Sequence, residues 1–104
     1  MGRARLYDAA RVHQSDARKN DPSRLDEGAA TVRELGIPGM REAAGIGNAW
    51  WAVNRETGQA VVVSTWDTLE HASQTLTSPE LLARLQALGV EGLGTTIYEV
   101  TDQI

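Results

Sequence analysis

Extended and helical segments alternate along this chain in an order that leaves few folds open to it. Four segments have apolar patterns typical of a strand, by alternation or as a short continuous run, and in two others apolar residues recur at helical spacing. The strand-like segments are residues 6–12, 41–53, 59–66 and 95–101, and the helical ones are residues 22–35 and 67–88. The order is therefore βαββαβ, which closes compactly as a ferredoxin-like split βαβ sandwich. We predict one α+β domain over residues 1–104, with a four-stranded antiparallel sheet and two helices on one face.

Proline, glycine and polar residues mark where the helices are expected to begin and end. Asp21 followed by Pro22 is typical of a helix start, and Gly36 is expected to end that helix. Asp67 has the place of the first residue in a capping box. Pro79 fits the first position of a new helical turn, so the second helical segment is expected to be interrupted before it.

Three further segments are expected to connect these elements. Residues 14–20 are almost entirely polar, so we predict that they cross the surface between the first strand and the first helix. Residues 37–39 contain proline and glycine and predict a turn. Residues 55–58 form a short loop between two strand-like segments, which predicts an antiparallel hairpin.

Helices on one face leave the other face of the predicted sheet uncovered. The third strand carries apolar residues on both of its faces, with Val62 opposed to Val61 and Val63. An exposed apolar sheet face of this size is typical of an interface. We therefore expect a homodimer that forms through the sheet face.

The composition excludes several classes of function. Ten Lys and Arg residues against fourteen Asp and Glu residues give a net charge of −4, which argues against a nucleic-acid partner. The chain has no cysteine, which excludes disulfides and thiolate chemistry, and its two histidines do not suggest a metal site. No stretch has the length of a membrane span or of a secretory signal. We expect a cytoplasmic protein without a membrane partner.

Parts of the sequence resemble a known superfamily. These parts are Pro38-Gly39-Met40-Arg41, the hairpin over residues 51–63 with its Glu56-Thr57-Gly58 turn, and the run from Val62 to Glu70 that contains Trp66. They look like the dimeric α/β-barrel superfamily, and most closely like antibiotic-biosynthesis-monooxygenase-like (ABM) domains. The resemblance implies a dimer in which two sheets form a barrel, with a cleft between sheet and helices in each subunit. It also implies that Trp66 matches the tryptophan at the end of the family's third strand.

The activities in this family include oxygenation of polyaromatic compounds and of quinols without metal or flavin, and haem degradation. The haem-degrading members pair the tryptophan with a histidine further along the next helical segment and an asparagine on the first strand. Here residues 74–78 contain no histidine, His71 follows Trp66 by only five positions, and the predicted first strand offers Asp8. We therefore expect no cofactor and keep haem binding or degradation as a third reading.

Oxygenation without a cofactor needs a substrate that can itself give an electron to oxygen, such as a phenolate or hydroquinone. The protein would bind the aromatic ring, help to remove a proton and stabilise the anion. We expect Trp50, Trp66 and Tyr98 to bind the substrate and His13, Asn48 and His71 to be the catalytic polar groups, with no metal site.

The adjacent tryptophans Trp50 and Trp51 point to opposite faces if their segment is extended, so at most one of them faces the cleft. Trp50 shares its face with Asn48 and Asn54. This more polar side favours Trp50 for the cleft.

The leading hypothesis is thus a small homodimeric, cofactor-independent monooxygenase acting on an aromatic or quinol-type metabolite. The alternative is a ligand-binding or interaction module of the same fold, in which the tryptophans belong to the core and the interface. The two readings differ in whether Trp66, one of the paired tryptophans and a histidine meet at one cavity.

Overall fold

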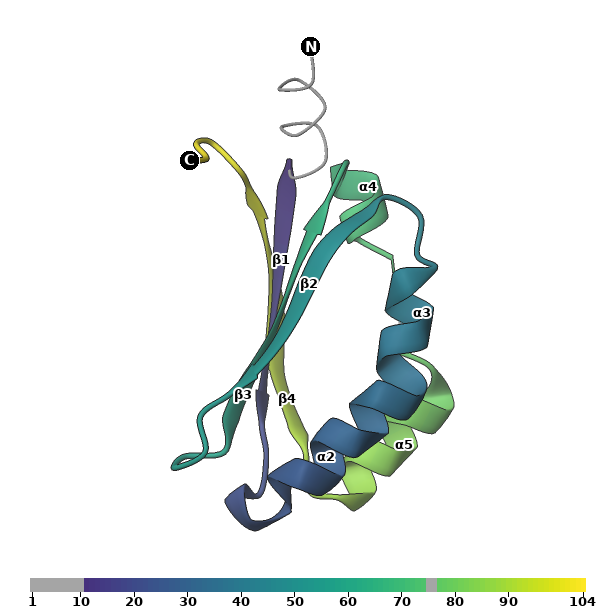
Figure 1. Cartoon of the computed structure of the whole chain (residues 1–104), viewed down its shortest axis with the longest axis vertical. Helices are drawn as coiled ribbons and strands as arrows, with labels where there is room; N and C mark the ends of the chain where they lie inside the picture. Colours follow the sequence, from purple (N-terminus) through teal and green to yellow (C-terminus); the bar gives the residue numbers. More distant parts are fainter. Residues whose placement is uncertain (1–10, 75–76) are drawn as a thin grey trace.

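The computed structural model describes residues 11–74 and 77–104 and shows a four-stranded antiparallel sheet with helices against one face (Figure 1). The strands lie in the order β2-β3-β1-β4. This is the predicted ferredoxin-like α+β architecture. The strands are β1 (Val12–Lys19), β2 (Ile46–Val53), β3 (Gln59–Trp66) and β4 (Glu91–Glu99). The helical elements are the 3₁₀ helix η1 (Pro22–Arg24), α2 (Leu25–Thr31), the π-helical turn η2 (Val32–Gly36), α3 (Ile37–Arg41), α4 (Leu69–Ala72) and α5 (Pro79–Ala87).

The first strand differs from its prediction. Most of the expected strand over residues 6–12 lies outside the described residues, and the segment 14–20, predicted to cross the surface, instead supplies most of β1. This strand is central, since β3 and β4 pair with it on either side. Backbone hydrogen bonding to two neighbours therefore holds β1 in the sheet even though its side chains are mainly polar.

The first helical layer is longer than predicted. Elements α2, η2 and α3 follow one another from Leu25 to Arg41, through Gly36 and Pro38, where we expected an end and a turn. Pro38 has no N–H to donate to the carbonyl four residues earlier. In the π-helical turn just before Pro38, hydrogen bonds join residues five apart instead of four. This looser turn lets the helix continue past the proline.

Because of this longer helix, β2 begins at Ile46 rather than near residue 41. Gly45, at φ +80°, makes the turn into the strand. A side chain at this position would meet Asp67 and His71, so both the backbone conformation and the space favour glycine.

The β2–β3 hairpin and the interrupted second helical segment agree with the prediction. The side chain of Asn54 accepts hydrogen bonds from the backbone N–H groups of Glu56 and Thr57 in the hairpin loop. Ser78 caps α5 by accepting from the Leu81 N–H. The cap of α4 is Thr68, which accepts from the His71 N–H, rather than Asp67.

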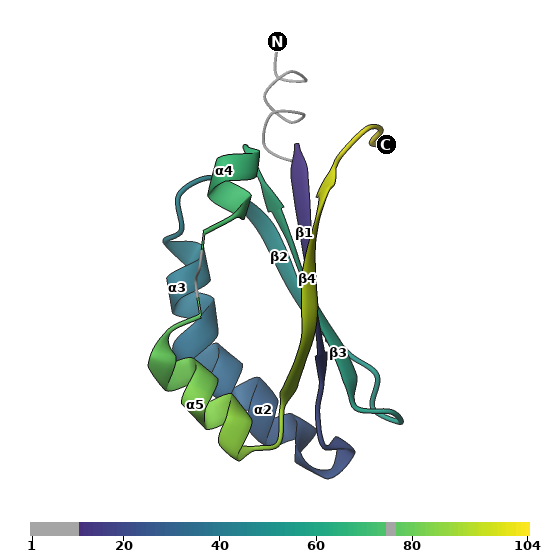
Figure 2. The ribbon, with the colours of Figure 1, turned by 180° about the vertical axis from the view of Figure 1, so that it is seen from behind.

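The core is small, and one cluster of it lies at one end of the sheet. Trp66 is fully buried there with Val12 and Ala72, and partly buried side chains of Met40 and Ile97 pack against them. Figure 2 shows that α2, α3, α4 and α5 all lie on the same side of the sheet, while no described element covers the other side. Within the described residues, no helix is both long and apolar enough to cross a membrane.

Candidate functional site

A cavity of about 440 Å³ lies between the sheet and the helices. We call it the polar cavity, because β1 supplies Gln14, Asp16 and Arg18 to its lining. Trp51 from β2 and Met40 from α3 supply apolar surface. Its remaining lining residues are Val32, Gly36, Val62, Ser73, Gln74, Thr77, Leu81, Thr95 and Ile97.

The polar residues of β1 are held in place by their own contacts. Arg18 donates two hydrogen bonds to the carboxylate of Asp16, from Nη2 at 2.8 Å and from Nε at 3.2 Å. The Arg18 and Asp16 side chains are 17% and 25% exposed, so this ion pair is largely withdrawn from solvent. Gln14 donates to the Ala72 carbonyl at 2.8 Å, which ties β1 to α4. These contacts hold the three polar side chains of β1 in fixed positions along one wall of the polar cavity.

A second cavity of about 500 Å³ lies beside the first, between α2, η2 and the other end of the sheet. We call it the apolar cavity, since its walls include Leu25, Ala29, Ile37, Val53 and Leu85. The two cavities share four lining residues, which are Arg18, Val32, Trp51 and Val62. Trp51 therefore stands where a polar and an apolar chamber adjoin.

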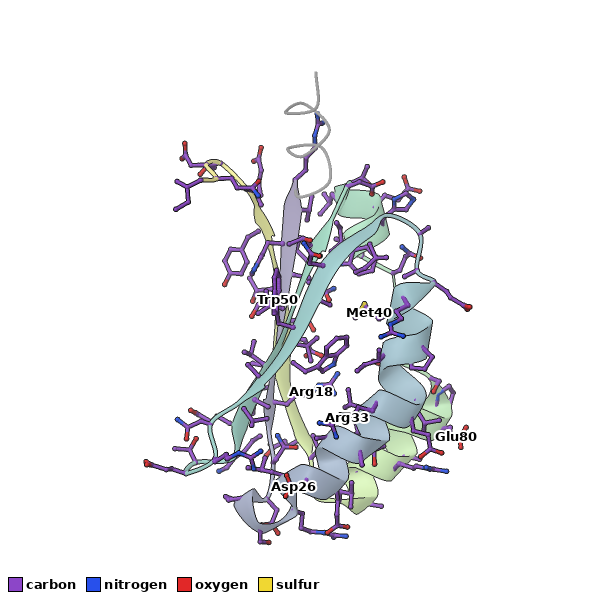
Figure 3. All side chains as sticks on the ribbon, in the orientation of Figure 1. Arg18, Asp26, Arg33, Met40, Trp50 and Glu80 are labelled. Atoms are coloured by element: carbon purple, nitrogen blue, oxygen red, sulfur yellow. The ribbon has the colours of Figure 1, made fainter. Side chains whose placement is uncertain are left out.

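The paired tryptophans lie on opposite faces of the sheet, as predicted, but the preference between them is reversed. Trp51 is paired with Val62 on the face toward the helices. Trp50 is paired with Val63, is 53% exposed on the other face, and borders the apolar cavity at the edge of the sheet (Figure 3). The polar neighbours that favoured Trp50 for the cleft reflect an exposed position. Asn48 is itself exposed.

Trp66 belongs to the core and lines neither cavity. Its indole N–H donates to the hydroxyl of Ser64 at 2.8 Å, and both side chains are fully buried. The expected contact of Trp66 with a substrate is not supported by this position, because no face of the ring is open to a ligand.

His13 and Tyr98 lie together on the outer face of the sheet. They are cross-strand partners of β1 and β4, and their ring centroids are 6.0 Å apart. Neither residue lines the polar or the apolar cavity. His13, expected at the end of the first strand, is the second residue of β1 as the structure describes it.

His71 lies on α4, which Figure 1 shows at the opposite end of the fold from α2. Its Nδ1 is 2.6 Å from Oδ1 of Asp67, and this hydrogen bond lowers the pKa of the Asp67 carboxyl. Asn48, the third expected catalytic residue, donates its backbone N–H to the Thr65 hydroxyl. Neither His71 nor Asn48 is among the residues that line the polar or the apolar cavity.

The expected convergence of Trp66, a paired tryptophan and a histidine is therefore not present in the described part of the chain. The residues that do converge are Trp51, Gln14, Asp16 and Arg18. The β1 residues were missed because their segment is polar. Their spacing at every second position was the signal that could have found them. No group of three or more His, Asp or Glu side chains among the described residues is placed to hold a metal.

Comparison with known proteins supports the fold. No protein-family model matches the sequence, and no curated protein matches it. Among solved structures, the chain is similar to a monooxygenase from the gene ActVA-Orf6 of Streptomyces coelicolor, solved with the ligand nanaomycin D. The TM-score is 0.71 at 15% identity, over 92% of each chain.

Two other solved structures extend this likeness. A proposed antibiotic biosynthesis monooxygenase from Deinococcus radiodurans is 22% identical, with a TM-score of 0.61 over 89% of this chain and 95% of that one. A dimeric ferredoxin-like protein from an uncultured marine organism is 11% identical, with a TM-score of 0.67 over 93% and 94%. The fold of this chain is therefore the ferredoxin-like fold of the ABM-like proteins, as the sequence resemblance implies.

Proposed function

We propose that the protein is a small homodimeric monooxygenase that needs no cofactor and acts on an aromatic or quinol-type molecule bound between sheet and helices. The observation that carries the proposal is the polar cavity, in which Trp51 stands beside the Asp16–Arg18 ion pair. The names of the Streptomyces and Deinococcus structures support a monooxygenase. The proposal keeps the cytoplasmic location expected from the sequence.

The three residues supply what such a reaction needs from the protein. Trp51 offers an aromatic face on which a planar ring can stack. Asp16 accepts a proton from the bound molecule, and Arg18 stabilises the phenolate or enolate that forms. Asp16 and Arg18 hold each other in place through their hydrogen bonds, so the two charged groups need little rearrangement when a ligand binds.

For an anthrone-type substrate the chemistry balances with molecular oxygen alone. The substrate anion gives an electron to oxygen, and the two radicals combine to form one new C–O bond. The second C–H bond of that carbon and the O–O bond then break, which leaves a carbonyl on the substrate and releases water. The carbon is oxidised and both oxygen atoms are reduced.

Oxygen uptake by the purified protein tests this proposal directly. A panel of anthrones and hydroquinones should include at least one that consumes oxygen faster with protein than in buffer. Asp16→Asn should lower that rate by about 100-fold, since general-base catalysis contributes on this order. Asp102→Asn, which changes an exposed carboxylate that lines neither cavity, is the matched control and should retain the rate. No uptake with any member of the panel would overturn the proposal.

A second candidate is a ligand-binding module of the same fold without turnover. It is favoured by the positions of His13 and His71, neither of which lines the polar or the apolar cavity. This reading predicts that aromatic ligands quench the fluorescence of Trp51 while no oxygen is consumed. The Trp51→Phe variant identifies which tryptophan reports the binding.

We further propose that a second copy of the chain covers the outer face of the sheet. Trp50 and Tyr98 are 53% and 52% exposed there. Ala17, Val61 and Leu93 line a depression on the sheet. The dimeric ferredoxin-like protein from the marine organism supports this arrangement. Packing through this face leaves the helix side of each subunit free for its own ligand.

A further inference from the structure

The apolar cavity contains an unusual set of charges. Its lining includes the three arginines Arg18, Arg33 and Arg55 and no Asp or Glu residue. The chain as a whole carries a net charge of −4. A cavity whose charged residues are all cationic therefore differs from the rest of the protein. The other lining residues are mainly aliphatic, which gives this chamber a hydrophobic wall with positive groups at its boundary.

The three arginines differ in how their charge is balanced. Arg18 is bound to Asp16, and Arg55 has an exposed ion pair with Asp26 at 3.4 Å. The side chain of Arg33, from η2, makes no hydrogen bond or ion pair within residues 11–74 and 77–104. Its guanidinium therefore retains all its donors for a ligand.

Arg33 also has the right place for a ligand that enters both cavities. Figure 3 shows Arg18 and Arg33 in the space between the sheet and the helices, where they approach from opposite sides. Arg18 borders both cavities, and Arg33 borders the apolar one. A ring stacked on Trp51 can therefore project a substituent toward Arg33 while it stays within the two adjoining cavities.

We propose that the ligand of this cleft carries a carboxylate next to its aromatic ring system, and that Arg33 binds that carboxylate. The inference rests on the proposed function, because it uses the same cleft for the ring. A guanidinium and a carboxylate form two parallel hydrogen bonds, which gives both affinity and a defined orientation. Arg33 thus selects acidic aromatic molecules over neutral ones of equal size.

A pair of probes with the same rings tests this selection. Anthracene-2-carboxylate and the neutral anthracene-2-carboxamide are titrated by calorimetry into the purified protein. The carboxylate should bind about tenfold more tightly, which corresponds to ~1.4 kcal/mol. The preference should decrease as salt is added, since Arg33 is an exposed residue whose charge is open to screening.

Variants show whether Arg33 is the cause. Arg33→Gln should remove the preference for the acid and leave binding of the amide unchanged, and Arg33→Lys should restore part of it. Arg41→Gln is the matched control, because Arg41 is exposed on α3, carries the same charge and lines neither cavity. It should keep the tenfold preference.

Each remaining outcome overturns the inference. If the amide binds as tightly as the acid, or if Arg33→Gln keeps the preference, Arg33 does not select a carboxylate, although the cleft still binds aromatic rings. If neither probe binds, the acidic ligand class is wrong. Oxygen uptake by the neutral anthrone panel then decides the proposed function separately.

Discussion

Ser64 and Trp66 form one buried pair on β3, and this pair combines packing with hydrogen bonding. Both side chains are fully buried, and the indole N–H donates to the serine hydroxyl. Removing either partner leaves the other without its hydrogen bond in a region that water does not reach. Trp66, the tryptophan on which the family resemblance depends, therefore stabilises the fold of this chain.

Trp66→Phe should lower the free energy of unfolding by about 2 kcal/mol, from the volume lost and the hydrogen bond lost. The double variant Trp66→Phe with Ser64→Ala should be less destabilised than the sum of the single variants, because no hydroxyl is then left without a partner. Urea denaturation at one protein concentration measures the free energy of unfolding of the unaltered protein, the two single variants and the double variant. Leu82→Ala, at an exposed position on α5, is the control and should change stability by about 0.5 kcal/mol or less. Strictly additive losses would contradict a contribution from the hydrogen bond.

Asp67 connects stability to pH. The hydrogen bond from His71 lowers the pKa of Asp67 in the folded protein, so the folded state favours the ionised carboxyl. The resulting stabilisation is present above the ordinary carboxyl pKa of about 3.9 and is lost as the pH falls below it, through the folded pKa. Asp67→Asn should therefore make the decrease in melting temperature between about pH 4 and pH 2 less steep. Asp102→Asn, at an exposed residue after β4, is the control and should leave the slope unchanged. Equal slopes for Asp67→Asn and the unaltered protein would contradict the assignment.

At the scale of the elements, the sequence predicts the strands and helices whose inward side chains are apolar and misses the strand whose inward side chains are polar. The apolar run in β3 and the apolar stripe of α5 were both found, because Val62, Leu81 and Leu85 are buried. β1 was missed because hydrophobic periodicity reports only strands whose side chains are buried among apolar atoms. Gln14, Asp16 and Arg18 point to the same side of the sheet as Val62, but they are polar, so β1 shows no apolar alternation.

The same reasoning explains what was found of the candidate site. The opposed directions of Trp50 and Trp51 follow from strand geometry alone. Which of them faces the helices depends on the register of β2, and the bulge between Ile46 and Ala49 shifts that register. A bulge depends on long-range pairing with β3, which a single sequence does not display.

At the scale of the whole molecule, the uncovered sheet face predicts the state of association. Sedimentation equilibrium should give twice the chain mass of 11.3 kDa. Trp50→Glu should shift the protein toward the monomer, because it places a charge on the face that we expect to be buried. Leu69→Glu, at an exposed position on the helix side, is the control and should leave the dimer intact. A monomer at all concentrations, or a dimer unaffected by Trp50→Glu, would contradict association through this face.

The two adjoining cavities also affect how the folded state is maintained. Among the residues that the structure describes, few helical side chains are buried, and these include Leu25, Leu81 and Leu85. A molecule that fills the space between the layers therefore adds apolar contact that the unfolded chain cannot make. By mass action, the stability of the protein then rises with the logarithm of the ligand concentration above its dissociation constant. In a cell that degrades unfolded chains, the abundance of this protein would follow the supply of its own ligand.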